Sequence, residues 1–213
     1  MKNFRNISRF RSLTQKGFTL IELAIVGLFL GILAVFAITA FSGTATNTTK
    51  ANGMFEAAQK LGDNWALAAQ SCAIPTDITA TVVGAGAAAT TAGKNLSMLV
   101  GTAGLTGTTY TQCIASSGIR PLTGMTTGVA GSEAIQGFAV TLTSTTTVAG
   151  RPAIAVNFAA VPDSMIIPLY NKYSSFTGAT TATALAASDA ADPTIQYGVV
   201  AAGVRTLTIV RPL

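Results

Sequence analysis

A long apolar segment, Phe18 to Phe41, constrains the fold more than any other feature of this sequence. It contains 24 residues and one charged side chain, Glu22. As an α-helix it would extend ~36 Å, which is enough to cross the ~30 Å apolar core of a bilayer. The apolar core of a secretory signal peptide is shorter, about 7–15 residues. The sequence therefore predicts a membrane-spanning helix over residues 18–41.

The charges lie mostly on one side of this segment. The net charge is +5, and five basic residues but no acidic residue lie within residues 1–16. From residue 17 onward, eight basic and eight acidic residues cancel. No basic stripe remains for DNA or RNA, so we expect no specific nucleic-acid binding. A basic segment before an apolar run is instead retained in the cytoplasm by the positive-inside rule.

Glu22 is the residue that a plain membrane anchor does not explain. A carboxylate inside a bilayer costs about 3 kcal/mol or more, so it needs a partner. Position 18 lies one helical turn before Glu22, on the same face of the helix. A cut between Gly17 and Phe18 would create an α-amine at Phe18 that could pair with Glu22. Pairing with a neighbouring chain would fix the axial register of packed helices.

The run Lys16-Gly17-Phe18-Thr19-Leu20-Ile21-Glu22-Leu23 resembles the processing motif of type IV pilins and related pseudopilins. The resemblance implies that prepilin peptidase cuts after Gly17 and N-methylates Phe18. It also implies that the helix rests in the inner membrane. An assembly platform and its ATPase then add it to a helical filament of identical copies on the bacterial surface. Phe18 and Glu22 would act in subunit assembly.

The long helix, together with the strand patterns described below, predicts an α+β subunit with the ladle shape of pilins. One long N-terminal helix would pack on an antiparallel sheet of about four strands. The expected parts are a leader over residues 1–17, a filament-core helix over 18–41, an amphipathic second helical half over 42–71 and a globular domain over 72–213. The leader of 17 residues and the remaining length are similar to the type IVb group, whereas Phe18 at the new N-terminus is typical of type IVa.

Glycines and small residues mark how this helix would pack. Gly27 and Gly31 form a Gly-x-x-x-Gly pattern, which lets helix backbones approach closely. Further along, an apolar stripe at three- and four-residue steps predicts that the helix continues to about Ser71 and packs on the sheet. The stripe consists of Met54, Ala58, Leu61, Trp65 and Ala69. Gly43, Gly53 and the threonines between them have poor helix propensity and weaken this helix. The weak stretch could be merely tolerated, or it could extend in the filament, and the sequence favours neither interpretation.

Cys72 and Cys113 are the two cysteines of the chain. If residues 72–213 lie outside the cytoplasm, the pair is expected to form a disulfide. Closing this loop would stabilise the fold by ~4 kcal/mol in the chain-entropy model. Two cysteines are too few for a structural zinc site without histidine, which this sequence lacks.

The globular region shows its clearest patterns near the C-terminus. Alternating apolar residues predict one hairpin from strands around 138–142 and 154–158, with a turn at 149–152, and a second from 199–200 and 204–210. A short helix is expected near Ser97–Gly101. Residues 161–173 are expected to form a short helix or an irregular crossover, broken at Pro168.

Little in the sequence indicates chemistry. No nucleophile–base pair, phosphate loop or metal cluster is evident, so we expect no enzyme activity, cofactor or metal. Asp189 and Asp192 are more simply a solvated turn than a calcium loop, since calcium takes six to eight oxygens. Asn47 and Asn95 fit the glycan acceptor pattern, which also arises by chance. The alternatives to a pilus subunit are a type II secretion pseudopilin or minor pilin, and a membrane-anchored periplasmic enzyme or binding protein.

Overall fold

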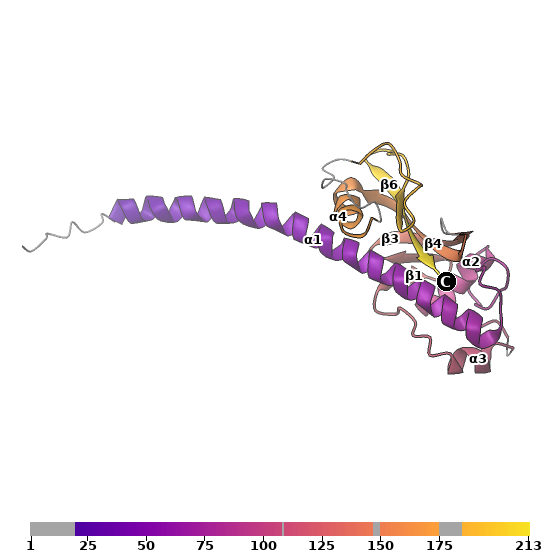
Figure 1. Cartoon of the computed structure of the whole chain (residues 1–213). Helices are drawn as coiled ribbons and strands as arrows, with labels where there is room; N and C mark the ends of the chain where they lie inside the picture. Colours follow the sequence, from indigo (N-terminus) through magenta and orange to yellow (C-terminus); the bar gives the residue numbers. More distant parts are fainter. Residues whose placement is uncertain (1–19, 108, 147–149, 175–184) are drawn as a thin grey trace, which may run out of the picture. The chain divides into compact units, whose positions relative to one another are not determined.

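The computed structural model describes residues 20–107, 109–146, 150–174 and 185–213, with the side chains of residues 35–45 left undescribed. The chain divides into two units, Met1–Gly43 and Thr44–Leu213, which are described separately below. The described part has the predicted α+β class (Figure 1). The helices are α1 (Leu20–Cys72), α2 (Thr91–Val100), α3 (Thr111–Ser116) and α4 (Asp163–Tyr173). The strands are β1 (Thr126–Val129), β2 (Ser132–Ile135), β3 (Phe138–Thr146), β4 (Pro152–Pro162), β5 (Ile195–Tyr197) and β6 (Val204–Pro212).

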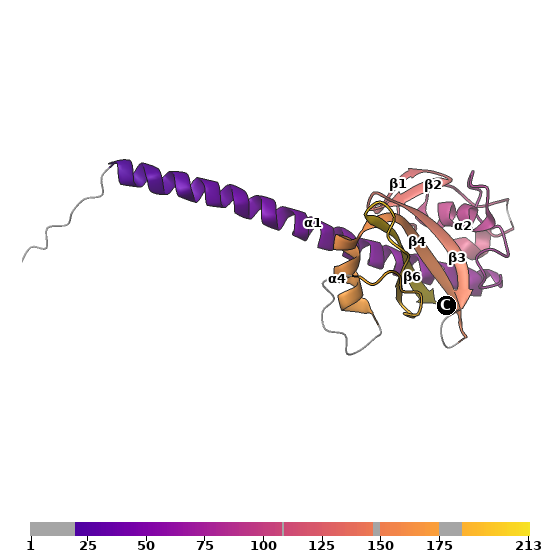
Figure 2. The ribbon, with the colours of Figure 1, turned by 90° about the horizontal axis from the view of Figure 1, so that it is seen from above.

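The strands form one antiparallel sheet in the order β1-β2-β3-β4-β6-β5. The order can be followed in Figure 2 from β1 and β2 through β3 and β4 to β6. The expected number of about four strands is therefore wrong. The β1–β2 hairpin, whose strands have four residues each, was not among the predicted elements.

One face of the sheet supplies the core. Cross-strand register aligns apolar side chains in two rows, because residues directly opposite one another share a face. The first row is Val140, Phe158, Leu207 and Tyr197, and the second is Leu142, Val156, Ile209 and Ile195. All eight are buried in one cluster. The opposite face is mixed: Asn157 hydrogen-bonds Thr143 and Thr208 there, whereas Ala155 and its cross-strand partner Val210 are buried on the same face.

The second half of α1 packs on this core. The predicted stripe of Met54, Ala58, Leu61, Trp65 and Ala69 is buried, which confirms that prediction. The helix runs without interruption through Gly43 and Gly53, so the poor helix propensity of this stretch does not break it. Polar contacts add to the packing, because Asn64 Nδ2 donates to the carbonyl of Arg120 at 2.9 Å.

Helix α2 is longer than the predicted helix near Ser97–Gly101, and it begins at a clear capping signal. The Thr90 side chain accepts a hydrogen bond from Gly93 N, and Gly101 ends the helix with a φ of 80°. Both features are typical helix ends.

The buried Asn95 joins α2 to the preceding loop. Its Oδ1 accepts from the amides of Val83 and Gly84, and its Nδ2 donates to the carbonyls of Ile78 and Thr81. Since this nitrogen is buried and fully used, a glycan at Asn95 is incompatible with the fold.

Two further expectations need correction. Val199 and Val200 do not form a strand; they lie exposed in the connection to β6, and the edge strand is instead β5. Helix α4 continues through Pro168 rather than breaking there. Burial of Met165, Ile166 and Leu169 offsets the hydrogen bond that a proline removes. The predicted strands around 138–142 and 154–158 are confirmed as parts of β3 and β4, whereas part of their predicted turn lies outside the described residues.

Candidate functional site

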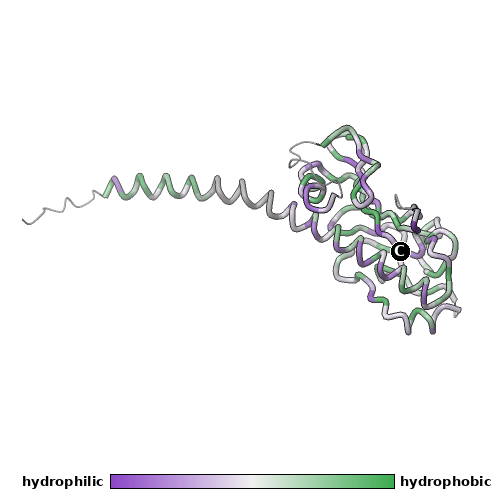
Figure 3. The backbone as a smooth tube through the Cα atoms, in the orientation of Figure 1, coloured by the Kyte–Doolittle hydropathy of each residue, from purple (hydrophilic) through white to green (hydrophobic). Residues whose placement is uncertain are grey.

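The N-terminal part of α1 exposes an unusual amount of apolar surface. Ten large apolar side chains between Leu20 and Leu33 are exposed, from 47% at Ile32 to 87% at Leu20. They include three consecutive residues, Leu28, Phe29 and Leu30, and therefore surround the helix rather than forming one stripe. The apolar character of this segment is visible in Figure 3. Within the part of the chain that the structure describes, no helix is both long and apolar enough to cross a membrane.

The predicted assembly residues lie on this segment. Glu22 is the acidic residue of the first turn of α1 and is exposed. Gly27 and Gly31 lie one turn apart, and a Cβ atom placed on either glycine would have nothing within 4 Å. Both glycines therefore leave the backbone open to approach by another helix. The predicted processing residues, Gly17 and Phe18, lie outside the described residues.

The predicted disulfide is present between Cys72 and Cys113. Cys72 is the last residue of α1, and Cys113 lies in α3. The bond thus ties the end of the long helix to a short helix 41 residues later that has no buried residue of its own.

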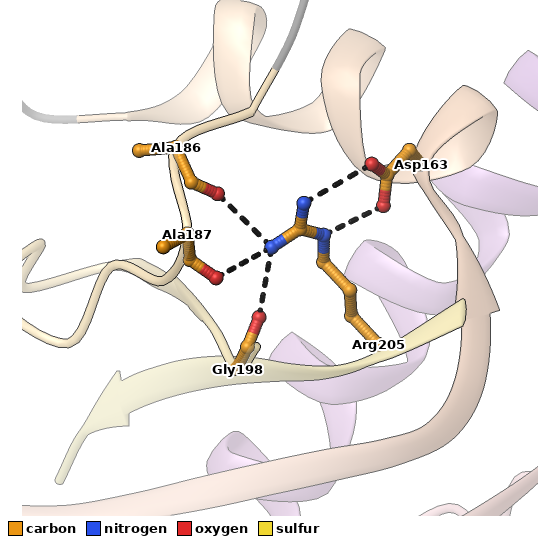
Figure 4. Close-up of polar contacts among 5 residues, drawn as sticks. All are labelled: Asp163, Ala186, Ala187, Gly198 and Arg205. Carbon is orange, nitrogen blue, oxygen red and sulfur yellow. Dashed lines mark hydrogen bonds and ion pairs between the residues drawn. The ribbon is translucent and has the colours of Figure 1, made fainter. Parts of the chain in front are cut away.

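A buried arginine that was not among the predicted site residues organises the C-terminal part of the sheet (Figure 4). Arg205 Nε donates to Asp163 Oδ1 at 2.7 Å, and Nη2 donates to Oδ2 at 3.3 Å. Its Nη1 donates to three backbone carbonyls, those of Ala186, Ala187 and Gly198, at 2.7–3.1 Å.

These contacts give Arg205 a structural role. Its side chain is 5% exposed, and it joins β6, the start of α4 and the chain around β5. The guanidinium carbon also lies 5.5 Å from the ring centre of Tyr197. The sequence did contain a signal for this site. Arg205 alternates with Leu207 and Ile209 along β6, so its side chain points to the same, buried face of the sheet. An inward arginine requires an acidic or carbonyl partner.

The two carboxylates of the predicted acidic turn bind protein groups. Asp189 accepts from the backbone amides of Ala191 and Asp192 and from the Tyr170 hydroxyl at 2.8 Å. Asp192 is buried and accepts from the amides of Thr194 and Ile195. The expectation of a solvated turn is therefore wrong for Asp192. Burial raises the pKa of Tyr170, and the hydrogen bond to Asp189 raises it further.

The described residues contain no group of three or more His, Cys, Asp or Glu side chains placed to hold a metal ion. Their main polar clusters, around Asn95, Arg205 and Asp192, hydrogen-bond backbone groups of the chain itself. Comparisons with protein families, with curated proteins and with solved structures found no match to this chain.

Proposed function

We propose that this chain is the structural subunit of a type IV pilus. In this proposal it is inserted in the inner membrane as a prepilin, cleaved after Gly17, N-methylated at Phe18 and assembled into a helical surface filament. The observation that carries the proposal is the N-terminal arrangement: a basic leader, glycine at position 17 and a single acid, Glu22, early in an apolar helix.

The exposed apolar surface of α1 supports the same function. Side chains exposed all around a helix require an apolar environment, which lipid or other helices can supply. A pilin uses both in succession, because its helix leaves the bilayer for the centre of a filament. Gly27 and Gly31 would let neighbouring helices pack closely there.

A feature of the Thr44–Leu213 unit also fits a subunit that is exposed outside the cytoplasm. Its disulfide suits an oxidising compartment outside the cytoplasm. Copies of the chain, prepilin peptidase and the assembly platform with its ATPase are the proposed partners.

The mature N-terminus provides the direct test. Mass spectrometry of the protein expressed with a prepilin peptidase should find a chain that starts at N-methylated Phe18. The Gly17→Glu variant should remain full-length in the membrane fraction, because a bulky charged residue does not fit the cleavage site. A matched Gly27→Ala variant should still be cleaved. Recovery of cleaved filaments from Gly17→Glu would reject the proposal, and so would a wild-type chain left uncleaved by the peptidase.

A further inference from the structure

A small pocket of about 160 Å³ lies between α2 and the strands β2 and β3. Half of the residues that line it are aliphatic, namely Ala88, Ala89, Leu96, Val140 and Leu142. Glu133 of β2 also lines the pocket, although this residue is 4% exposed. A nearly buried acid in an aliphatic pocket is unusual and calls for a physical reason.

One carboxylate oxygen of Glu133 is fully engaged. Oε1 accepts from the hydroxyls of Ser97 and Thr102, the latter at 3.0 Å, and from the amide of Gly131 at 2.9 Å. These three donors, from α2, from the loop after α2 and from the β1–β2 turn, fix the orientation of the side chain. The carboxylate is therefore held in place before any ligand arrives.

The second oxygen of Glu133 is available. Among the described residues, none donates a hydrogen bond to Oε2, and no lysine or arginine nitrogen lies within 4.0 Å of the carboxylate. No side-chain oxygen of this part of the chain is both unpaired and closed off from solvent. Oε2 is therefore not closed off from solvent, and Glu133 is one of the residues that line the pocket.

The charge and shape of the pocket define its ligand. A largely desolvated carboxylate without a cationic partner is stabilised by a cation that donates hydrogen bonds. The aliphatic half of the lining suits a methylene chain, and the lining residues include no aromatic ring of the kind that holds quaternary ammonium groups. A single carboxylate is too few for calcium, which takes six to eight oxygens. A primary alkylammonium group meets both requirements.

We propose that this pocket is a binding site for a primary alkylammonium group, with the ammonium on Glu133 Oε2 and the methylene chain against Leu96 and Val140. The group is either a free amine or the side chain of a lysine on a second copy of this chain. Lys94 lies on α2 one turn before Ser97, so its own side chain is a further candidate that the test must separate.

Titration of the full-length chain in detergent micelles with n-butylammonium chloride tests the chemistry. Calorimetry at constant ionic strength should show that n-butylammonium binds the wild type saturably. Tetramethylammonium should show no binding. Glu133→Gln keeps the shape and the acceptor at Oε1 but removes the charge, so binding should weaken at least tenfold. Glu56→Gln removes an exposed acid of α1 and should bind as the wild type does. Ala89→Leu, which fills the pocket and leaves Glu133 intact, should also abolish binding.

Carbodiimide cross-linking identifies the source of the ammonium group. Mixed ¹⁴N- and ¹⁵N-labelled chains are assembled, cross-linked and digested, and peptides joined through Glu133 are weighed. A mixed-isotope link from Glu133 to a lysine assigns the site to a second copy, and absence of such a link assigns it to a free amine. A same-isotope link to Lys94 would show that the chain fills its own pocket and would overturn the proposal. Butylammonium binding that is absent, or unchanged in Glu133→Gln, would overturn it as well.

Discussion

At the scale of single residues, the Arg205 side chain supplies hydrogen bonds to a part of the chain that has few sheet hydrogen bonds of its own. The chain around β5 contributes three residues to the sheet, so sheet hydrogen bonds alone hold it weakly. Arg205 gives three carbonyls of this region a common donor and compensates its own charge with Asp163. A guanidinium suits this role because it has five donors in a fixed plane.

Replacing Arg205 with methionine should therefore lower the free energy of unfolding by ~3 kcal/mol, since Asp163 loses its counter-ion and three carbonyls lose their donor. Urea unfolding of the full-length chain in detergent measures the change. Arg211→Met is the matched control, because Arg211 pairs with Asp63 at an exposed position and should contribute at most about 1 kcal/mol. Equal losses from the two variants would contradict the special role of Arg205.

The sequence predicts residue roles best where a pattern repeats. The buried stripe on α1 follows from its spacing, and the disulfide follows from there being two cysteines. Asn95 and Glu133 have no such pattern, because their importance comes from loops that fold back on them. Gly84 illustrates this: a Cβ placed there would lie 1.9 Å from the carbonyl oxygen of Lys94, a closeness that no local spacing reveals.

At the scale of secondary-structure elements, the disulfide compensates for the weak packing of α3. Replacing both Cys72 and Cys113 with serine should lower the free energy of unfolding by ~4 kcal/mol, because the unfolded chain regains the freedom of a 41-residue loop. Denaturant unfolding of this variant should match that of the wild type under a reducing agent. An unchanged unfolding midpoint would contradict the stabilising role of the bond.

The helices and strands that were predicted best are those whose buried residues follow a regular pattern along the sequence. Strands β3 and β4 alternate or bury long apolar runs, so their patterns were clear. Strand β1 buries none of its four residues, and Val129 is 71% exposed, which leaves no pattern to detect. The strand predicted at Val199 and Val200 is absent because β propensity reflects side-chain packing, and these two side chains face solvent.

At the scale of the whole molecule, Glu22 separates a pilin from a plain anchor. In an anchor, Glu22→Leu should ease membrane insertion by up to ~3 kcal/mol and impair nothing. In the proposed pilin, each incoming Phe18 amine would lose its partner in a medium of low dielectric constant. We therefore expect Glu22→Leu to be cleaved and inserted but to build no filaments, as judged by electron microscopy of sheared cells beside immunoblots of membranes. Wild-type filament yield from cells expressing this variant alone would contradict the pairing mechanism.

The stability of the fold should fall at alkaline pH, partly through Tyr170. Burial raises the pKa of Tyr170 above its ordinary value of 10.0, so the unfolded chain loses this proton first as the pH increases. The contribution is fully present below the unfolded value and is lost as the pH rises through the folded one. Tyr170→Phe should therefore show a shallower decline in unfolding free energy above about pH 10 than the wild type. Parallel declines in urea unfolding series at increasing pH would contradict this assignment.

The bond between Cys72 and Cys113 also affects what a protease can do to this molecule. Residues 73–112 lie inside a covalent ring, and the described ones among them, apart from α2 and the start of α3, are mainly turns and irregular chain, where proteases cut most readily. A cut anywhere in this ring releases no fragment, because both new ends stay joined through sulfur. A nicked subunit would therefore keep all of its residues and their connection to α1 until a reductant reached the disulfide.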